Sequence, residues 1–271
     1  MIAVSTSGPA VAGERRLWRA VAIPTEHGGW GLTLEPVLLG MVIAFSWSGL
    51  AIGLAAFLAF LVRTPMKLAL VDRRRNRSLP RTRLATRLAA TEFGLLGLLG
   101  AFASWTAGAE WLIPVLIAAP LVAVELWFDI RSRSRRLVPE LAGAVGISAV
   151  AASITLAGGE SWRLAVALWV VLTARAVASI PFVRTQIMRM RRGSAPLGTT
   201  DLFQLTGAAL GFAAVAVSTQ VFAGAIAVAV VAAAQSLATR REHIPAVKVI
   251  GLRQMAAGLV IVAVTAVGVL A

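Results

Sequence analysis

Long apolar runs alternate with short polar stretches along the whole chain. About nine of these runs are roughly 17–24 residues long, the length that crosses a hydrocarbon core of about 30 Å. Hydropathy places them at residues 28–47, 49–71, 84–106, 111–130, 137–157, 162–184, 202–219, 221–239 and 251–270. The pattern therefore predicts an all-α fold, a polytopic membrane bundle of about nine transmembrane helices.

Positive charge marks every second connection between the runs. The chain has 26 Lys and Arg residues, and all of them except Arg163 fall in five polar stretches, at 15–19, 63–87, 131–136, 175–192 and 240–253. Cytoplasmic segments of membrane proteins carry an excess of Lys and Arg, and this bias sets orientation. We expect a multi-pass protein of the bacterial cytoplasmic (inner) membrane, with the N-terminus in the cytoplasm and the C-terminus outside.

A single membrane domain accounts for the composition. Residues 1–20 are expected to form a short cytoplasmic tail without the apolar core of a signal peptide, and residues 21–271 one transmembrane domain. The chain has no cysteine and two histidines, so we expect neither thiol chemistry nor a multi-histidine metal site.

The net charge of +14 is concentrated at helix ends. Membrane lipids, and not nucleic acid, are therefore the expected partners, and the oligomeric state is left open.

The first apolar run contains candidate catalytic groups. Glu26 and His27 begin this run, and Glu35 lies about two turns deeper. At about 100° per residue, His27 and Glu35 are about 80° apart and can face one cavity. Ionisable groups inside a membrane usually face the bundle interior, and Pro36 is expected to break the helix beside Glu35. The alternative for Glu26 is an interfacial helix cap, which does not explain a carboxylate as deep as Glu35.

The inner end of the second run contains candidate binding groups for an anion. Arg63 and Lys67 lie one helical turn apart ahead of an apolar stretch, and Asp72 opens an arginine-rich loop. Arginine binds phosphate and carboxylate oxygens through two parallel hydrogen bonds. The alternative is a solvated positive-inside loop, which fits the loop arginines better than it fits Arg63 and Lys67.

The end of the sixth run adds Arg175 and Arg184 as further anion-binding candidates. Arg175 is about two and a half turns from Arg184, so it lies inside the membrane and needs a carboxylate partner. Glu35, Glu92 and Glu140 are the candidates for that partner. The alternative is that Arg175 forms a purely structural ion pair.

Glu125 and Asp129 share one face of the fourth run. At a spacing of four residues, their carboxylates lie one turn apart and are candidate oxygen ligands for a divalent metal. The alternative, which we favour, is pairing with arginines of the loops, because arginines greatly outnumber acids in this chain.

The arrangement of these segments resembles the UbiA-type intramembrane prenyltransferase superfamily. In that family, aspartate-rich motifs after the second and sixth helices bind magnesium and a prenyl diphosphate. The stretch from Asp72 to Arg83 is similar to the tail of the first motif, whereas Arg63, Lys67 and Arg184 stand where acids would be expected. The resemblance implies the fold and an isoprenoid-like ligand. It does not extend to magnesium, because the aspartate-rich motifs are absent, and the cofactor stays unassigned.

A closer resemblance is to the YwiC-like family of bacterial integral membrane proteins, for which no activity is implied. The residues that carry it are Pro24, Glu26, His27, Gly28, Trp30, Glu35, Pro36, Arg63, Pro65 and the arginine-rich end of the sixth run. The resemblance extends over nearly the whole chain and implies a fold more than a function.

Three functions remain open at this level. The first, which we favour, is binding of an amphipathic anion, an isoprenoid or lipid-like molecule, in a polar cavity open to the cytoplasmic face. If a reaction occurs there, the protein is a divergent prenyltransferase-like transferase. The second is proton-coupled transport of a small solute or anion. The third is a non-catalytic accessory or assembly role in a membrane complex, so whether the protein is an enzyme is undecided.

Overall fold

The computed structural model describes residues 18, 21–22, 27–77, 79–131 and 136–271, and this part of the chain is helical throughout its regular structure. The elements are α2 (His27–Ile43), α3 (Trp47–Arg74), α4 (Pro80–Ala107), α5 (Leu112–Ile130), α6 (Leu137–Ala157), α7 (Trp162–Arg192), α8 (Leu197–Val217), η1 (Thr219–Val221), α9 (Phe222–Thr239) and α10 (Val247–Leu270). The predicted all-α fold is confirmed.

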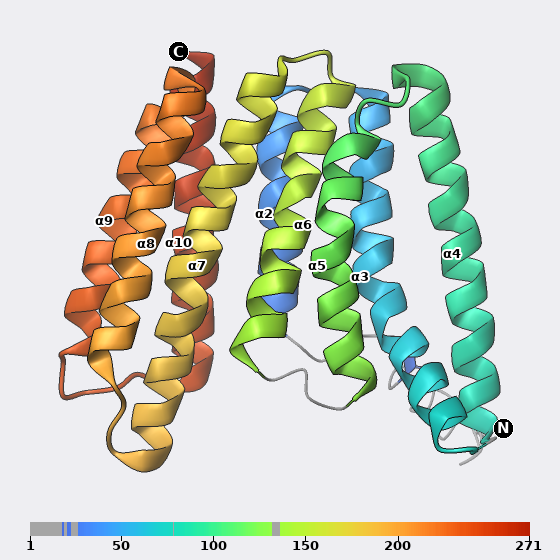
Figure 1. Cartoon of the computed structure of the whole chain (residues 1–271), viewed down its shortest axis with the longest axis horizontal. Coiled ribbons are helices and arrows are strands. Elements are labelled where there is room, and N and C mark those ends of the chain that lie inside the picture. The colour runs from blue at the N-terminus through green and yellow to red at the C-terminus, as the bar shows by residue number, and fades with distance from the viewer. Residues whose placement is uncertain (1–17, 19–20, 23–26, 78, 132–135) are drawn as a thin grey trace, which may run out of the picture.

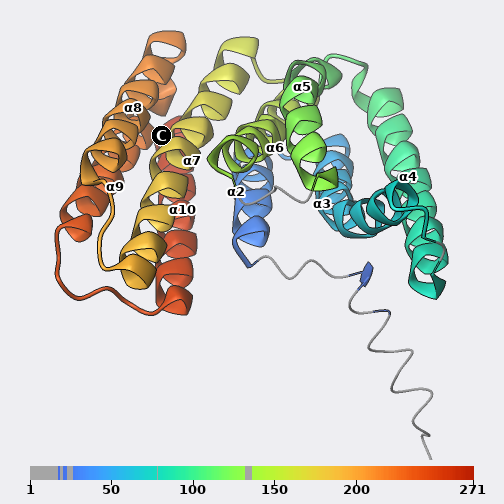
Figure 2. The same ribbon diagram turned by 60° about the horizontal axis from the view of Figure 1, so that its bottom comes forward.

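The helices stand side by side in an up-and-down bundle (Figure 1). The C-terminal ends of α3, α5, α7 and α9 lie together at one end, which we call the basic end because the clusters of Lys and Arg in the sequence adjoin these helix ends. Helix α2 packs against α6 and α10 and also touches α3 and α7. Helix α4 lies at one edge, against α3, while α8 and α9 lie at the opposite edge (Figure 2). Helix α2 therefore joins the two sides of the bundle.

Length and surface character define a multi-pass membrane protein. Among the described residues, eight helices are long and apolar enough to cross a membrane, and α2 contributes a shorter apolar stretch, Gly29–Ile43. Large apolar side chains such as Leu98, Leu205 and Val267 are exposed on the outside of the bundle. A lipid environment accommodates such a surface, which would be unfavourable in water.

Several helices extend beyond the limits predicted from hydropathy. Helix α3 continues to Arg74, α4 begins at Pro80 and α7 continues to Arg192, because charged residues end an apolar run without ending the backbone hydrogen bonds. The prediction that Pro36 breaks the first helix is wrong, since α2 is continuous from His27 to Ile43 with Pro36 inside it. Proline removes one backbone donor, and the surrounding helices hold α2 in one piece.

Small residues allow the central helices to approach closely. A Cβ atom added at Gly40 would lie 2.8 Å from Ile154 of α6, and one at Gly207 would lie 2.8 Å from the carbonyl oxygen of Ala174 in α7. Contacts of this kind replace the hydrophobic effect as the source of helix association in lipid. They bring α2, α6, α7 and α8 close enough for side chains inside the bundle to pair.

Candidate functional site

The deepest ion pair joins Glu35 of α2 to Arg175 of α7. Arg175 Nη2 donates to Glu35 Oε1 at 2.7 Å, and the two side chains are only 6% and 3% exposed, respectively. Roughly 20 Å of helix separates Arg175 from Trp162 at the opposite end of α7, so the pair lies within the thickness of a bilayer core. Of the three partners expected for Arg175, the structure selects Glu35. Taking two charges out of water is costly unless they pair, and this pairing offsets the cost.

A glycine of α10 makes room for this pair. A Cβ atom at Gly258 would overlap the Glu35 carboxylate and would lie 2.7 Å from Arg175 Nη2. Arg175 Nη2 also donates to the backbone carbonyl of Gln254 in α10, at 3.0 Å. Helix α10 therefore closes the site from the side opposite α6 and supplies one of its acceptors.

Three glutamine side chains extend the polar contacts across the bundle. Gln235 Nε2 in α9 donates to Gln254 Oε1 at 3.2 Å, and Gln204 Nε2 in α8 donates to Gln235 Oε1 at 3.1 Å. Gln204 Nε2 also donates to the Ala178 carbonyl of α7 at 2.9 Å. The contacts thus run from Glu35 and Arg175 through α10, α9 and α8 and return to α7. We call this set the interior network.

The sequence reasoning missed Gln235, Gln254 and Gly258. It searched the apolar runs for ionisable groups, although neutral amides inside a membrane also need hydrogen-bond partners. A search for glutamine within the last three runs would have found the two amides. The role of Gly258 depends on which side chain faces it, and no local pattern reveals that.

The interior network leaves two buried atoms without a partner. Arg175 Nε and Gln204 Oε1 are buried and make no hydrogen bond within the described structure. Both belong to side chains that are almost fully buried, at 6% and 3% exposure. Unsatisfied polar atoms are rare in the interior of proteins and usually indicate bound water or a ligand.

A second group of charges lies nearer the basic end, between α3 and α5. Arg63 contacts two carboxylates, with Nε 2.7 Å from Asp129 Oδ2 and Nη1 2.7 Å from Glu125 Oε1. Lys67 Nζ lies 3.5 Å from Asp129 Oδ1. Among the described residues, Glu125 and Asp129 pair with cations of α3, whereas the expected pairing with loop arginines stays a prediction.

Helix α6 connects this group to a third pair. Arg184 Nη1 of α7 donates to Glu140 Oε2 of α6 at 2.9 Å, and both side chains are 33% exposed. One turn further along α6, a Cβ atom at Gly143 would overlap the Glu125 carboxylate. The first turns of α6 thus lie between the two charged groups. We call the set Arg63, Lys67, Glu125, Asp129, Glu140 and Arg184 the basic-end site.

The predicted anion-binding residues therefore do not form one cluster. Arg63, Lys67 and Arg184 belong to the basic-end site, whereas Arg175 belongs to the interior network. Nine residues correspond to about 180° of rotation around a helix, so Arg175 and Arg184 face opposite sides of α7. Contacts agree with this, because Arg175 meets α2 and α10 while Arg184 meets α6.

Asp72 forms hydrogen bonds that link the end of α3 to the start of α4. Its carboxylate accepts from Arg81 Nη2 at 3.1 Å and from Thr82 Oγ1 at 2.7 Å, and Thr82 Oγ1 accepts from the Leu79 backbone amide at 3.2 Å. The backbone of Asp72 also accepts from Arg77 N at 2.9 Å. The structure thus gives Asp72 a local role at the ends of two helices, and a role in binding a substrate stays a prediction.

Replacing Asp72 with alanine is expected to loosen the α3–α4 connection. Thr82 and Arg81 lose their shared acceptor, so exchange of the Leu79, Arg81 and Thr82 amide hydrogens should become roughly ten-fold faster, the effect of losing about one charge-assisted hydrogen bond. Arg73→Ala, an exposed position in the same turn, is the matched control. Equal exchange in the two variants would show that the carboxylate does not hold this connection.

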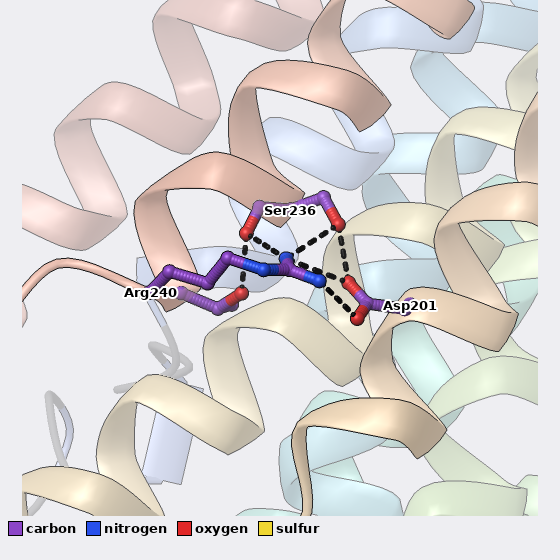
Figure 3. A network of polar contacts seen from close by, with 4 residues as sticks. Asp201, Ser236 and Arg240 are labelled. Carbon is purple, nitrogen blue, oxygen red and sulfur yellow. Dashed lines mark hydrogen bonds and ion pairs between the residues drawn. The ribbon is translucent and has the colours of Figure 1, made fainter.

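A separate polar network clamps α8 to α9 at the edge of the bundle (Figure 3). Arg240 Nη2 lies 2.7 Å from Asp201 Oδ2, and Ser236 Oγ also donates to Asp201. Arg240 is 53% exposed, so water competes for these contacts and the pair contributes little to stability. This network is a suitable reference against which the buried pairs can be compared.

The remaining predicted residues are placed as follows. Glu26 and the side chain of His27 lie outside the described residues, so their predicted catalytic role is not tested. Glu92 of α4 has one buried carboxylate oxygen, Oε2, without a hydrogen-bond partner in the described structure. Among the described residues, no three His, Cys, Asp or Glu side chains are grouped as a metal site would require. Glu125 and Asp129 form only a pair of acids, and both contact Arg63.

Fold and charges together define a multi-pass helical membrane protein with ion pairs inside its bundle. The sequence model of the YwiC-like protein family matches residues 23–155, so this part of the chain is similar to the YwiC-like family. The match covers α2 to α5 and nearly all of α6, which is narrower than the resemblance expected over nearly the whole chain. Neither curated proteins nor solved structures gave a match, so the likeness to the UbiA-type superfamily stays a prediction.

Proposed function

We propose that this protein binds the anionic head of an amphipathic molecule, of the isoprenoid or lipid-like class, at the basic-end site. The supporting observation is that Arg63, Lys67 and Arg184, from two different helices, remain partly exposed, at 27%, 32% and 33%, although each is paired. The basic end is assigned to the cytoplasmic face of an inner membrane on the positive-inside rule.

The proposed binding reaction at this site is an exchange of partners. The carboxylates of Glu125 and Glu140 hold guanidinium groups that match phosphate oxygens equally well. An incoming anionic head takes the place of these carboxylates on Arg63 and Arg184, and the cations neutralise its charge without a metal. The apolar tail then lies along the exposed hydrophobic surface of the bundle, and its transfer out of water contributes about 0.8 kcal/mol for each CH₂ group. If a reaction follows, it is a group transfer from the bound head.

Removal of the Arg63 or Arg184 side chain is expected to weaken binding of geranyl diphosphate. The Arg63→Ala and Arg184→Ala proteins each lose a charge-assisted contact, which corresponds to a dissociation constant at least about ten-fold higher. Binding to the purified full chain in detergent would be measured by calorimetric titration, with inorganic diphosphate and geraniol as separate ligands to divide the effect between head and tail.

Arg240→Ala is the matched control. Arg240 is also an ion-paired arginine near the basic end, but it follows α9 directly and pairs with Asp201 of α8, away from the basic-end site. If the wild type, Arg63→Ala, Arg184→Ala and Arg240→Ala bind geranyl diphosphate with equal affinity, the proposed role of the basic-end site is contradicted. Such a result would leave the ion pairs with a role in helix packing alone, as expected for an accessory or assembly protein.

A further inference from the structure

The guanidinium of Arg175 is only partly used in the interior network. A guanidinium carries five N–H donors, and both hydrogen bonds that Arg175 makes with described residues come from Nη2. Nε is buried and has no partner among these residues. The contact with Glu35 is therefore made by one nitrogen, whereas arginine commonly holds a carboxylate with two. The Nε–H of this buried guanidinium is therefore available to another hydrogen-bond acceptor.

Among the described residues, Glu35 is the one carboxylate that contacts Arg175. Helix α2 contributes Glu35, and α10 contributes the Gln254 carbonyl and the space left by Gly258. On the same turn of α7, the Ala178 carbonyl is taken by Gln204, whose own Oε1 is a buried acceptor without a partner. The network thus has both an unused donor and an unused acceptor in its interior, far from the basic-end site.

We infer that Arg175 forms an interior binding site for a small oxyanion, and that Glu35 acts as a tethered competitor for the same guanidinium. The free Nε–H is the first contact of the ligand, and a carboxylate-like group then takes over the Nη2 contact that Glu35 makes in the present structure. The ligand is small because Arg175 and Glu35 are nearly fully buried. This site is independent of the proposed lipid-like ligand, which needs the partly exposed cations of the basic-end site.

Acetate is the appropriate probe, because it is the free equivalent of the Glu35 carboxylate. Potassium acetate would be titrated calorimetrically into the purified full chain in detergent, against potassium chloride at equal ionic strength. In the Arg175→Lys variant, the cation that pairs with Glu35 is kept while the Nε–H is lost, so acetate should bind at least about ten-fold more weakly. In Glu35→Gln the competitor is gone, so acetate should bind at least about ten-fold more tightly.

Arg240→Lys makes the same substitution in an exposed ion pair and should bind acetate as the wild type does. Acetate affinity should fall in Arg175→Lys and rise in Glu35→Gln if Glu35 competes with the ligand. If the two residues form only a structural pair, acetate affinity should fall in both variants. Absence of acetate binding by the wild type, or equal binding by the wild type and Arg175→Lys, would overturn the inference and leave water as the partner of Nε. Geranyl diphosphate affinity should be unchanged in Arg175→Lys. Failure of the acetate test can therefore be distinguished from failure of the proposed binding at the basic-end site.

Discussion

Replacing Glu35 with glutamine is expected to destabilise the protein by about 3–5 kcal/mol. The substitution keeps the size of the side chain but leaves the Arg175 cation buried without a counter-charge, at 6% exposure. Arg175→Gln should cost a similar amount for the converse reason. The double variant should be more stable than the sum of the two losses predicts, because neither charge is then left unpaired. The measurement is a double-mutant cycle of reversible unfolding in mixed micelles.

The reference for this cycle is the Asp201–Arg240 pair at the edge of the bundle. Asp201 is 25% exposed and Arg240 is 53% exposed, so Asp201→Asn should change the free energy of unfolding by about 0–1 kcal/mol. Strict additivity of the Glu35 and Arg175 variants would mean that the two side chains do not stabilise each other. A loss in Asp201→Asn as large as that in Glu35→Gln would show that burial is not the cause.

A methyl group at Gly258 is expected to destabilise the bundle by about 1–3 kcal/mol or more. The added Cβ of Gly258→Ala would overlap the Glu35 carboxylate and approach Arg175 Nη2 to 2.7 Å. Neither group can move away without leaving its partner, so α10 must shift from α2 and the Gln254 contact weakens. Unfolding of the purified protein in mixed micelles would measure the loss.

Gly251 on the same helix is the matched control, because a Cβ atom there meets nothing within 4 Å. Gly251→Ala should therefore stabilise α10 by about 0.5–1 kcal/mol, as alanine does in an open helical position. The two substitutions are chemically identical and should act with opposite signs. If Gly258→Ala is as stable as Gly251→Ala, the space left by Gly258 is not needed by the ion pair.

The candidate site was only partly predictable from the sequence. Glu35 and Arg175 were identified as charges too deep to be explained by orientation, and Glu35 was among three possible partners of Arg175. The pairing itself joins residues 140 positions apart and depends on α2 lying between α6 and α10. Gln235, Gln254 and Gly258 escaped notice because a neutral amide or a glycine looks like ordinary packing until its neighbours are known.

The structure also changed the interpretation of the deep cations. Arg63, Lys67, Arg175 and Arg184 were expected to hold one anionic head, because they lie too deep, or too near apolar turns, to be explained by orientation alone. The structure divides them between the basic-end site and the interior network, and it provides each with a carboxylate contact. The spacing along one helix sets which residues share a face, but the neighbouring helix decides what that face meets.

By itself, the sequence determined the helical class, the approximate spans and the separation of charge between the two ends. These properties follow from local quantities, since hydropathy over about 20 residues and the placement of Lys and Arg act on each segment separately. Only the tertiary structure decided that Glu35 meets Arg175, that glutamines of three helices join them, and that Gly258 leaves the space. These contacts depend on helix neighbours, which are selected in lipid by the close fit of small side chains between helices far apart in the chain.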